Sequence, residues 1–158
     1  DLATHRGYDS APALFAGVRA DDLVWQRLEQ QLRPLEADVL LAINRNHLGL
    51  LPYFPLQNGL LTGKFTRTER PVDSRIMRQR PHIAENAPWN VLEAYEAFCD
   101  ARGITMLEAT FGWLLAQPGL SSVIAGTTRP EQLRQNAAAS TAWKPSSEEI
   151  AHVSAIFD

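Results

Sequence analysis

The sequence predicts an α/β fold in which parallel strands carry helices packed on their outside. Two apolar runs, at residues 48–54 and 122–125, have the character of strands covered on both faces. Each run leads into a loop rich in Gly and polar side chains, and a clear helix follows the second loop. Because strands alternating with helices are typical of parallel sheets and barrels, we expect a binding site at the carboxyl ends of these strands.

Size and composition indicate one ordinary globular domain, residues 1–158. Hydrophobic residues make up 45% and charged residues 21% of the chain, as in average soluble domains. The net charge of −3 and the lack of a Lys/Arg block argue against nucleic-acid binding. No apolar run approaches about 18 residues, the length that a membrane span needs. The single Cys99 excludes an internal disulfide and a cysteine zinc cluster, so we expect a cytoplasmic protein without a visible signal peptide.

The first third of the chain has a mixed pattern. Residues 1–12 resemble a short strand end and a loop, and residues 13–33 carry apolar side chains near a helical period. Residues 34–47 are predicted as a helix, since Pro34 suits a first turn and apolar side chains follow on one face. The strand at 48–54 comes directly after this helix.

A long excursion with poor periodicity is expected at residues 57–89. Pro and Gly interrupt it and several Arg side chains line it. Long loops of this kind are usually functional lids or disordered segments. Within it, residues 65–88 have little apolar area to offset the entropy of ordering, so we expect them to be the most mobile interior region.

The rest of the chain is dominated by predicted helices. Residues 89–102 repeat apolar side chains at helical spacing and end before Gly103, a residue suited to the position after a helix. A Ser at the amino end and acids in the first turn favour a last helix starting at 146. The other expected elements are a helix at 107–117, a strand at 122–125 and a helix at 130–139.

The second polar segment has the composition of an anion site. Gly126 allows a ligand to approach the backbone, Thr127 and Thr128 offer hydroxyls, and Arg129 offers a planar fork suited to phosphate. The helix that follows adds free N–H groups at its amino end. The alternative is that these residues only cap a helix and are otherwise solvated.

Three amide side chains follow along the same helix. They recur at i, i+3 and i+4, a spacing that places them on one face, where amides can read an adenine edge; they are Gln132, Gln135 and Asn136. In the first segment, Tyr53 stands at the end of a strand and could stack on a planar ring. The alternative for Tyr53 is a buried side chain in the wall of a barrel.

Together these segments resemble the aldo-keto reductase family. The resemblance rests on the runs LGLLPYFPL (48–56), GLLTGK (59–64), WLLAQPG (113–119) and the phosphate-loop segment, and it covers residues 34–158 well and 1–33 poorly. It implies a partial (β/α)8 TIM barrel, here the carboxyl-terminal half. It also implies an oxidoreductase whose substrates are small carbonyl compounds, aldehydes or ketones, and whose cofactor is NADPH.

The resemblance also implies roles for individual residues. Tyr53 would stack on the nicotinamide, and the pyrophosphate would be lined by Leu56, Gly59 and Lys64. The region around the adenosine 2′-phosphate would be formed by Thr127, Thr128, Arg129 and Gln132 at the Gly126 turn, with Gln135 and Asn136 at the adenine.

The amino end resembles the family's fourth strand, which ends in a catalytic His. His5 would be that residue, although the family spacing is one residue longer, and a surface-loop His is the alternative. The other histidines stand in polar helix ends or loops, and no pair has metal-ligand spacing, so no metal site is expected; they are His47, His82 and His152.

The chain lacks most of what the family's chemistry requires. The resemblance implies an Asp, a Tyr acid, a Lys and a His, of which three come from earlier strands, and neither Tyr8 nor Lys64 replaces them. A full barrel takes typically about 250 residues, and only 20 residues separate Pro12 from Arg33. A fragment, an internal deletion and an incomplete sequence would each explain this truncated pattern. We therefore expect the chain alone to have no useful reductase activity.

Two other functions stay open. One is a non-catalytic half-barrel that binds a nucleotide or a protein, and the other is an α/β domain of unrelated role. An incomplete barrel would leave open sheet edges, which could be covered by the segment at 65–82 or cause self-association.

Overall fold

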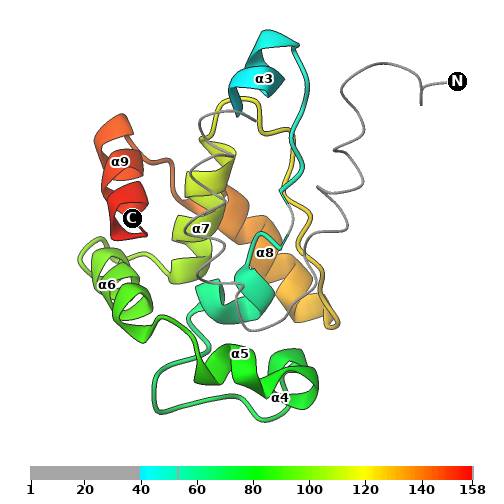
Figure 1. Cartoon of the computed structure of the whole chain (residues 1–158), viewed down its shortest axis with the longest axis vertical. Coiled ribbons are helices and arrows are strands. Elements are labelled where there is room, and N and C mark those ends of the chain that lie inside the picture. Colours follow the sequence, from blue (N-terminus) through cyan, green and yellow to red (C-terminus); the bar gives the residue numbers. More distant parts are fainter. Residues whose placement is uncertain (1–39, 53, 158) are drawn as a thin grey trace, which may run out of the picture.

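The computed structural model describes residues 40–52 and 54–157 (Figure 1). The predictions for His5 and Tyr53, and for the elements before residue 40, lie outside the described residues. The described helices are α3 (Leu40–Arg45), η3 (Gln57–Thr62), α4 (Arg75–Gln79), α5 (Pro81–Glu85), α6 (Trp89–Asp100), α7 (Met106–Leu115), α8 (Pro130–Ala142) and α9 (Ser147–Ile156).

The long helices begin and end where the local sequence directs them. Thr105 caps α7 and Ser146 caps α9, each in a capping box in which an acid three residues on reaches back to the cap's own N–H. Gly103 follows α6 with φ of 64°, a conformation that Gly adopts without strain. The predicted helices at 89–102, 107–117 and 130–139 are confirmed, and α8 extends further, to Ala142.

Neither predicted strand forms within the described residues, and residues 122–125, predicted as a buried strand, include no buried residue. Leu50, in the segment predicted as the first strand, instead pairs at one point with the chain just before 122–125. The N–H of Leu50 donates to the carbonyl of Gly119 at 2.8 Å, and the N–H of Ser121 donates to the carbonyl of Leu50 at 2.9 Å. This pairing is a parallel bridge between Leu50 and Leu120. Because no strand is present in the described ranges, the predicted partial barrel is not confirmed. Parallel strands are stable mainly in sheets covered on both faces, a condition that a two-segment contact does not meet.

A close backbone approach accompanies this bridge. An added Cβ on Gly49 would overlap the side chain of Ser121. Gly49 therefore allows the chain before Leu50 to run next to the chain after Leu120.

The prediction of a structureless excursion at 57–89 is wrong. This segment contains η3, α4 and α5, and Leu60, Phe65, Ile76 and Ala84 are buried in the main core. Its apolar residues are too far apart to give a helical period, but each lies where a short helix or turn meets the core. The expectation of little burial in 65–88 is therefore also wrong, while the mobility of that segment stays a prediction.

The core lies around α6 and α7. Tyr95 is almost fully buried, its hydroxyl lies 3.1 Å from that of Thr110, and its ring meets the Phe157 ring edge-on at 5.1 Å. Helix α7 packs on η3, α6 and α8, and it lies between α6 and α8 in Figure 1. Consequently the first polar segment, through η3, and the second polar segment, through α8, are both attached to α7.

Candidate nucleotide-binding site

The first polar segment forms a tight, left-handed turn. Backbone φ is positive at Gln57 (47°), Asn58 (58°), Gly59 (99°) and Gly63 (74°). Leu60 has no exposed surface and anchors the turn in the core, and the hydroxyl of Thr62 donates to the carbonyl of Gly59 at 2.6 Å. The turn is thus held from inside.

The residues predicted to line a pyrophosphate stand on this turn. Leu56 precedes η3, Gly59 lies within it, and Lys64 follows Gly63. The first two are half-buried, and Lys64 is exposed. The ammonium of Lys64 is therefore on the surface, where an anion can reach it.

The second polar segment leads into α8 in an extended conformation. Arg129 is the N-cap residue, with φ −134° and ψ 140°, and no side chain caps the helix. An added Cβ on Gly126 would meet no atom within 4 Å, so the space beside that backbone is open. Thr127 is half-buried, whereas Thr128 and Arg129 are exposed. The start of α8 therefore presents the Arg129 guanidinium to solvent. It offers few free N–H groups, because Pro130 has none and the Gln132 N–H donates to the Arg129 carbonyl at 3.1 Å, and Glu131 in the first turn opposes an anion there.

The three amides lie on α8 as their spacing predicts. Gln132 and Asn136 are half-buried and Gln135 is exposed. The side-chain oxygen of Gln132 accepts a hydrogen bond from the Thr128 N–H at 3.3 Å. Gln132 thereby ties the threonine turn to the helix and keeps its amide N–H₂ for another partner.

The two segments share a frame but are not bonded to each other. Helix α7 packs against both η3 and α8, and the Leu50–Leu120 bridge joins the chains that lead into the two segments. Within the described ranges, no hydrogen bond links residues 55–64 to residues 122–136.

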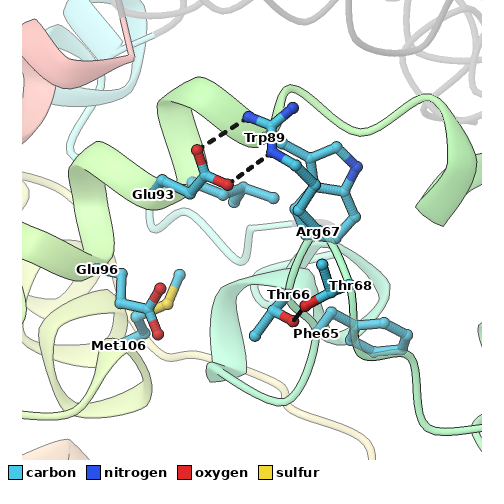
Figure 2. Close-up of a pocket in the computed structure, with 9 residues that line it drawn as sticks. Phe65, Thr66, Arg67, Thr68, Trp89, Glu93, Glu96 and Met106 are labelled. Atoms are coloured by element: carbon cyan, nitrogen blue, oxygen red, sulfur yellow. Dashed lines mark hydrogen bonds and ion pairs between the residues drawn. The ribbon is translucent and has the colours of Figure 1, made fainter.

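A small groove that the sequence did not indicate lies beside the first segment (Figure 2). Its volume is about 220 Å³, below the range of about 300–1,000 Å³ that is usual for small-molecule sites. The floor is apolar, from Phe65, Trp89, Leu92 and Met106, and the rim is formed by Thr66, Arg67, Thr68, Glu93 and Glu96. Arg67 and Glu93 pair across 26 positions of sequence, so no local periodicity could reveal the contact.

Comparison with known sequences decides the family. The pattern that defines the aldo/keto reductase family matches residues 25–158. The chain belongs to the aldo/keto reductase family. The resemblance drawn from the short runs around the two polar segments is therefore confirmed.

Relatives of the chain in this family are named for different activities. The chain is 31% identical over 125 residues to an L-glyceraldehyde 3-phosphate reductase of Escherichia coli O157:H7, covering 75% of this chain and 36% of that protein. It is 33% identical over 110 residues to an NADH-specific methylglyoxal reductase of Escherichia coli K12, covering 68% and 33%. A probable voltage-gated potassium channel subunit beta of Arabidopsis thaliana is 28% identical over 107 residues, covering 65% and 33%. The chain thus spans about a third of the length of these aldo/keto reductase relatives.

The tyrosine that the structure describes does not suit acid chemistry. Burial raises the pKa of Tyr95, and the hydrogen bond with Thr110 only partly opposes this rise. Burial likewise raises the pKa of Cys99 to about 12, so its thiol stays protonated at neutral pH. Both groups are buried in the core, where they have almost no contact with solvent.

Two further features are absent from the described part of the chain. No helix there is long and apolar enough to cross a bilayer. No group of three or more His, Cys, Asp or Glu side chains is arranged there to hold a metal ion.

Proposed function

We propose that this chain provides the dinucleotide-binding part of an oxidoreductase that reduces a small aldehyde or ketone with NADPH. The observation that carries the proposal is the attachment of η3 and α8 to one helix, α7, in a chain of the aldo/keto reductase family. The nicotinamide, when bound, supplies the hydride for carbonyl reduction. The chain's own residues bind and orient the dinucleotide.

The residues present fit such a ligand at both segments. Around the pyrophosphate we assign Leu56, Gly59 and Lys64, because the η3 turn is held from the core and leaves the Lys64 ammonium exposed. Tyr53 and His5 keep the roles that the family implies, against the nicotinamide and the substrate. Around the adenosine we assign the uncapped start of α8 and its amide face, namely Gly126, Thr127, Thr128, Arg129, Gln132, Gln135 and Asn136.

The preference for NADPH is proposed from Arg129. An exposed guanidinium at the amino end of a helix, beside the Thr128 hydroxyl, suits the 2′-phosphate, which only NADPH carries. Hydrogen bonds to charged groups contribute roughly 1.5–3 kcal/mol each, so NADPH should bind about ten- to a hundredfold more tightly than NADH. One relative in the family is named as NADH-specific, and this makes the preference a property to be measured in this chain.

Titration of both dinucleotides by calorimetry tests the proposal. Arg129→Ala should remove most of the NADPH preference and leave NADH affinity unchanged. The matched control is Arg134→Ala, an exposed arginine further along α8, which should leave the preference intact. Equal weakening of both dinucleotides by Arg129→Ala would show that Arg129 is structural. Failure of the unmutated chain to bind either one would remove the proposed function.

The second candidate is a module that binds a nucleotide or a protein without catalysis. Two observations favour it: Tyr95 is committed to the core, and a family relative is named as a probable potassium channel subunit. Positioned proton transfer contributes typically about 10²–10⁴-fold to a rate, so a chain without the acid should turn over poorly. NADPH oxidation with methylglyoxal or glyceraldehyde decides between the candidates. Robust turnover that Tyr53→Phe or Tyr8→Phe abolishes would establish catalysis by this chain.

We also propose that the chain associates with itself through the edge at residues 48–52. Leu50 uses its N–H and carbonyl in the parallel bridge, so the backbone groups of Gly49 and Leu51 face the opposite edge. Those groups form no hydrogen bond within the described ranges, and the side chains of Leu48 and Leu51 are 52% and 54% exposed. Open edges of this kind pair readily with another strand.

Sedimentation over a range of concentrations tests this self-association. Leu51→Lys should weaken it at least tenfold, because a charge on an edge strand opposes pairing. Val72→Lys is the control, since Val72 is even more exposed, at 76%, but lies just before α4. A monomer at all concentrations, or equal weakening by both variants, would contradict the proposal.

A further inference from the structure

Arg67 ties the chain that follows the first polar segment to helix α6. Its Nε donates to Oε1 of Glu93 at 2.8 Å, and its Nη2 donates to Oε2 of Glu93 at 2.9 Å and to Oδ1 of Asn90 at 2.7 Å. Figure 2 shows the guanidinium facing the Glu93 carboxylate, with two dashed lines joining them. Two parallel bonds of this type hold a fixed orientation that a single bond does not.

The short chain between Lys64 and this ion pair is restrained at several points. Phe65 is buried, and the backbone N–H of Thr66 donates to the carbonyl of Glu69 at 2.9 Å. In return, the N–H of Glu69 donates to Oγ1 of Thr66 at 2.8 Å. Arg70 then lies with its guanidinium carbon 5.8 Å from the centre of the Trp89 ring. The backbone that carries Lys64 is thus fastened to α6 within three residues of it.

Arg67 itself is poorly suited to bind an anion directly. Glu93 neutralises its charge, and its Nε and Nη2 are engaged with Glu93 and Asn90. The hydrogen bond with Glu93 raises the pKa of Arg67 and lowers the pKa of Glu93, so both groups stay ionised at neutral pH. Lys64, in contrast, is exposed and takes part in no ion pair within the described residues.

We propose that Arg67 is a positioning residue that acts through Lys64 on the pyrophosphate of the dinucleotide. This inference rests on the proposed function. Lysine is a point charge on a flexible stem, so the place of its backbone decides how often the ammonium reaches a phosphate. The Arg67–Glu93 pair reduces that freedom by fixing the chain next to Lys64, and no part of the pair touches the ligand.

The experiment measures the affinity of two probes by calorimetry. NADP⁺ carries the pyrophosphate, whereas adenosine 2′-monophosphate carries only the groups assigned to α8. Exposed ion pairs have small effects individually because solvent screens them, and the additional bond to Asn90 strengthens this one. Arg67→Gln and Glu93→Gln should each weaken NADP⁺ by about three- to fivefold and leave adenosine 2′-monophosphate unchanged. Arg75→Gln is the control, because the Arg75 Nε donates only to Gln79 on its own helix, at 3.0 Å.

Two further variants test whether the effect passes through Lys64. In a Lys64→Gln background, Arg67→Gln should have no additional effect on NADP⁺, whereas a merely structural role would still weaken binding. The exchanged pair R67E/E93R should recover at least half of the lost affinity. All variants should keep the helical circular dichroism of the unmutated chain.

The outcomes separate this inference from the function on which it rests. If Arg67→Gln leaves the affinity for both probes unchanged, or weakens both equally, the positioning role is wrong and the proposed function stands. An unmutated chain that binds neither probe would remove the proposed function and this inference with it.

Discussion

Two regions of the chain differ in how fully their backbone groups are hydrogen-bonded and their side chains packed. One is formed by helices α6, α7 and α9, and the other by the paired segments around Leu50 and Leu120. In the helical region, capping boxes satisfy the starts of α7 and α9, and aromatic side chains fill the space between the helices. In the paired segments, one parallel bridge is formed, and Leu51 and Ile124 remain 54% and 65% exposed. A helix satisfies its backbone within itself, whereas a parallel strand needs neighbours on both edges. The helices can therefore satisfy their backbone hydrogen bonds within this chain, whereas the paired segments keep an unpaired edge.

Truncation of one leucine in each region should separate them most clearly. Leu92 is 4% exposed in the core, and Leu51 is 54% exposed beside the bridge. Leu92→Ala should lower the free energy of unfolding by about 2–5 kcal/mol, because it leaves a cavity. Leu51→Ala should change it by less than about 0.5 kcal/mol. Urea unfolding followed by circular dichroism measures both, and similar losses would show that the segments at 48–52 are packed in solution.

Addition of one methyl group tests the contact that holds α7 to the end of α8. A Cβ on Gly112 would lie 2.7 Å from both the ring and the carbonyl of Trp143. Gly112→Ala should therefore destabilise the chain by about 1–3 kcal/mol, as overpacking does. Gly126→Ala is the matched control on the open side, where a Cβ meets no atom within 4 Å. Thermal unfolding of the two variants should differ clearly, and equal midpoints would contradict the close packing.

Removal of the caps should weaken the helical region alone. Thr105→Ala and Ser146→Ala each delete a hydroxyl that accepts a backbone N–H, at 3.2 Å in both cases. Each should cost about 1 kcal/mol of unfolding free energy. The control is Thr141→Ala, since the Thr141 hydroxyl donates within α8 at 3.2 Å and caps no helix start. A loss from Thr141→Ala as large as from the caps would count against this account.

The smallest expected effect is on the pH dependence of stability. The backbone N–H of Ser146 and then the Arg102 side chain hold the pKa of Glu149 below its usual value of 4.5. A carboxyl whose pKa is lowered in the folded chain stabilises it above the unfolded pKa and loses that contribution as the pH falls through the folded value. Unfolding measured from pH 7 to pH 3 should therefore show a steeper acid loss in the unmutated chain than in Glu149→Gln. Parallel curves would mean that Glu149 has the same pKa in both states.

Local signals in the sequence were sufficient for the helical region. Ser146, Gly103 and Pro130 mark helix boundaries through backbone chemistry that depends on near neighbours, and the structure has those boundaries. The family was also evident from short runs around the two polar segments, and the match over residues 25–158 confirms it. The roles of the individual site residues stay predictions, because they depend on a ligand and on Tyr53 and His5, which lie outside the described residues.

Other features required the tertiary structure, for one physical reason: they join residues that are distant in the sequence. The short helices α4 and α5 were invisible in the periodicity, because single residues such as Ile76 and Ala84 gain their stability from a core built elsewhere. Arg67 and Glu93 form an ion pair whose partners carry no common local pattern. Sequence alone determined the family, the main helices and their caps, since these depend on neighbouring residues. Only packing into the shared core decided how the excursion folds, and only the folded chain brought Arg67 to Glu93.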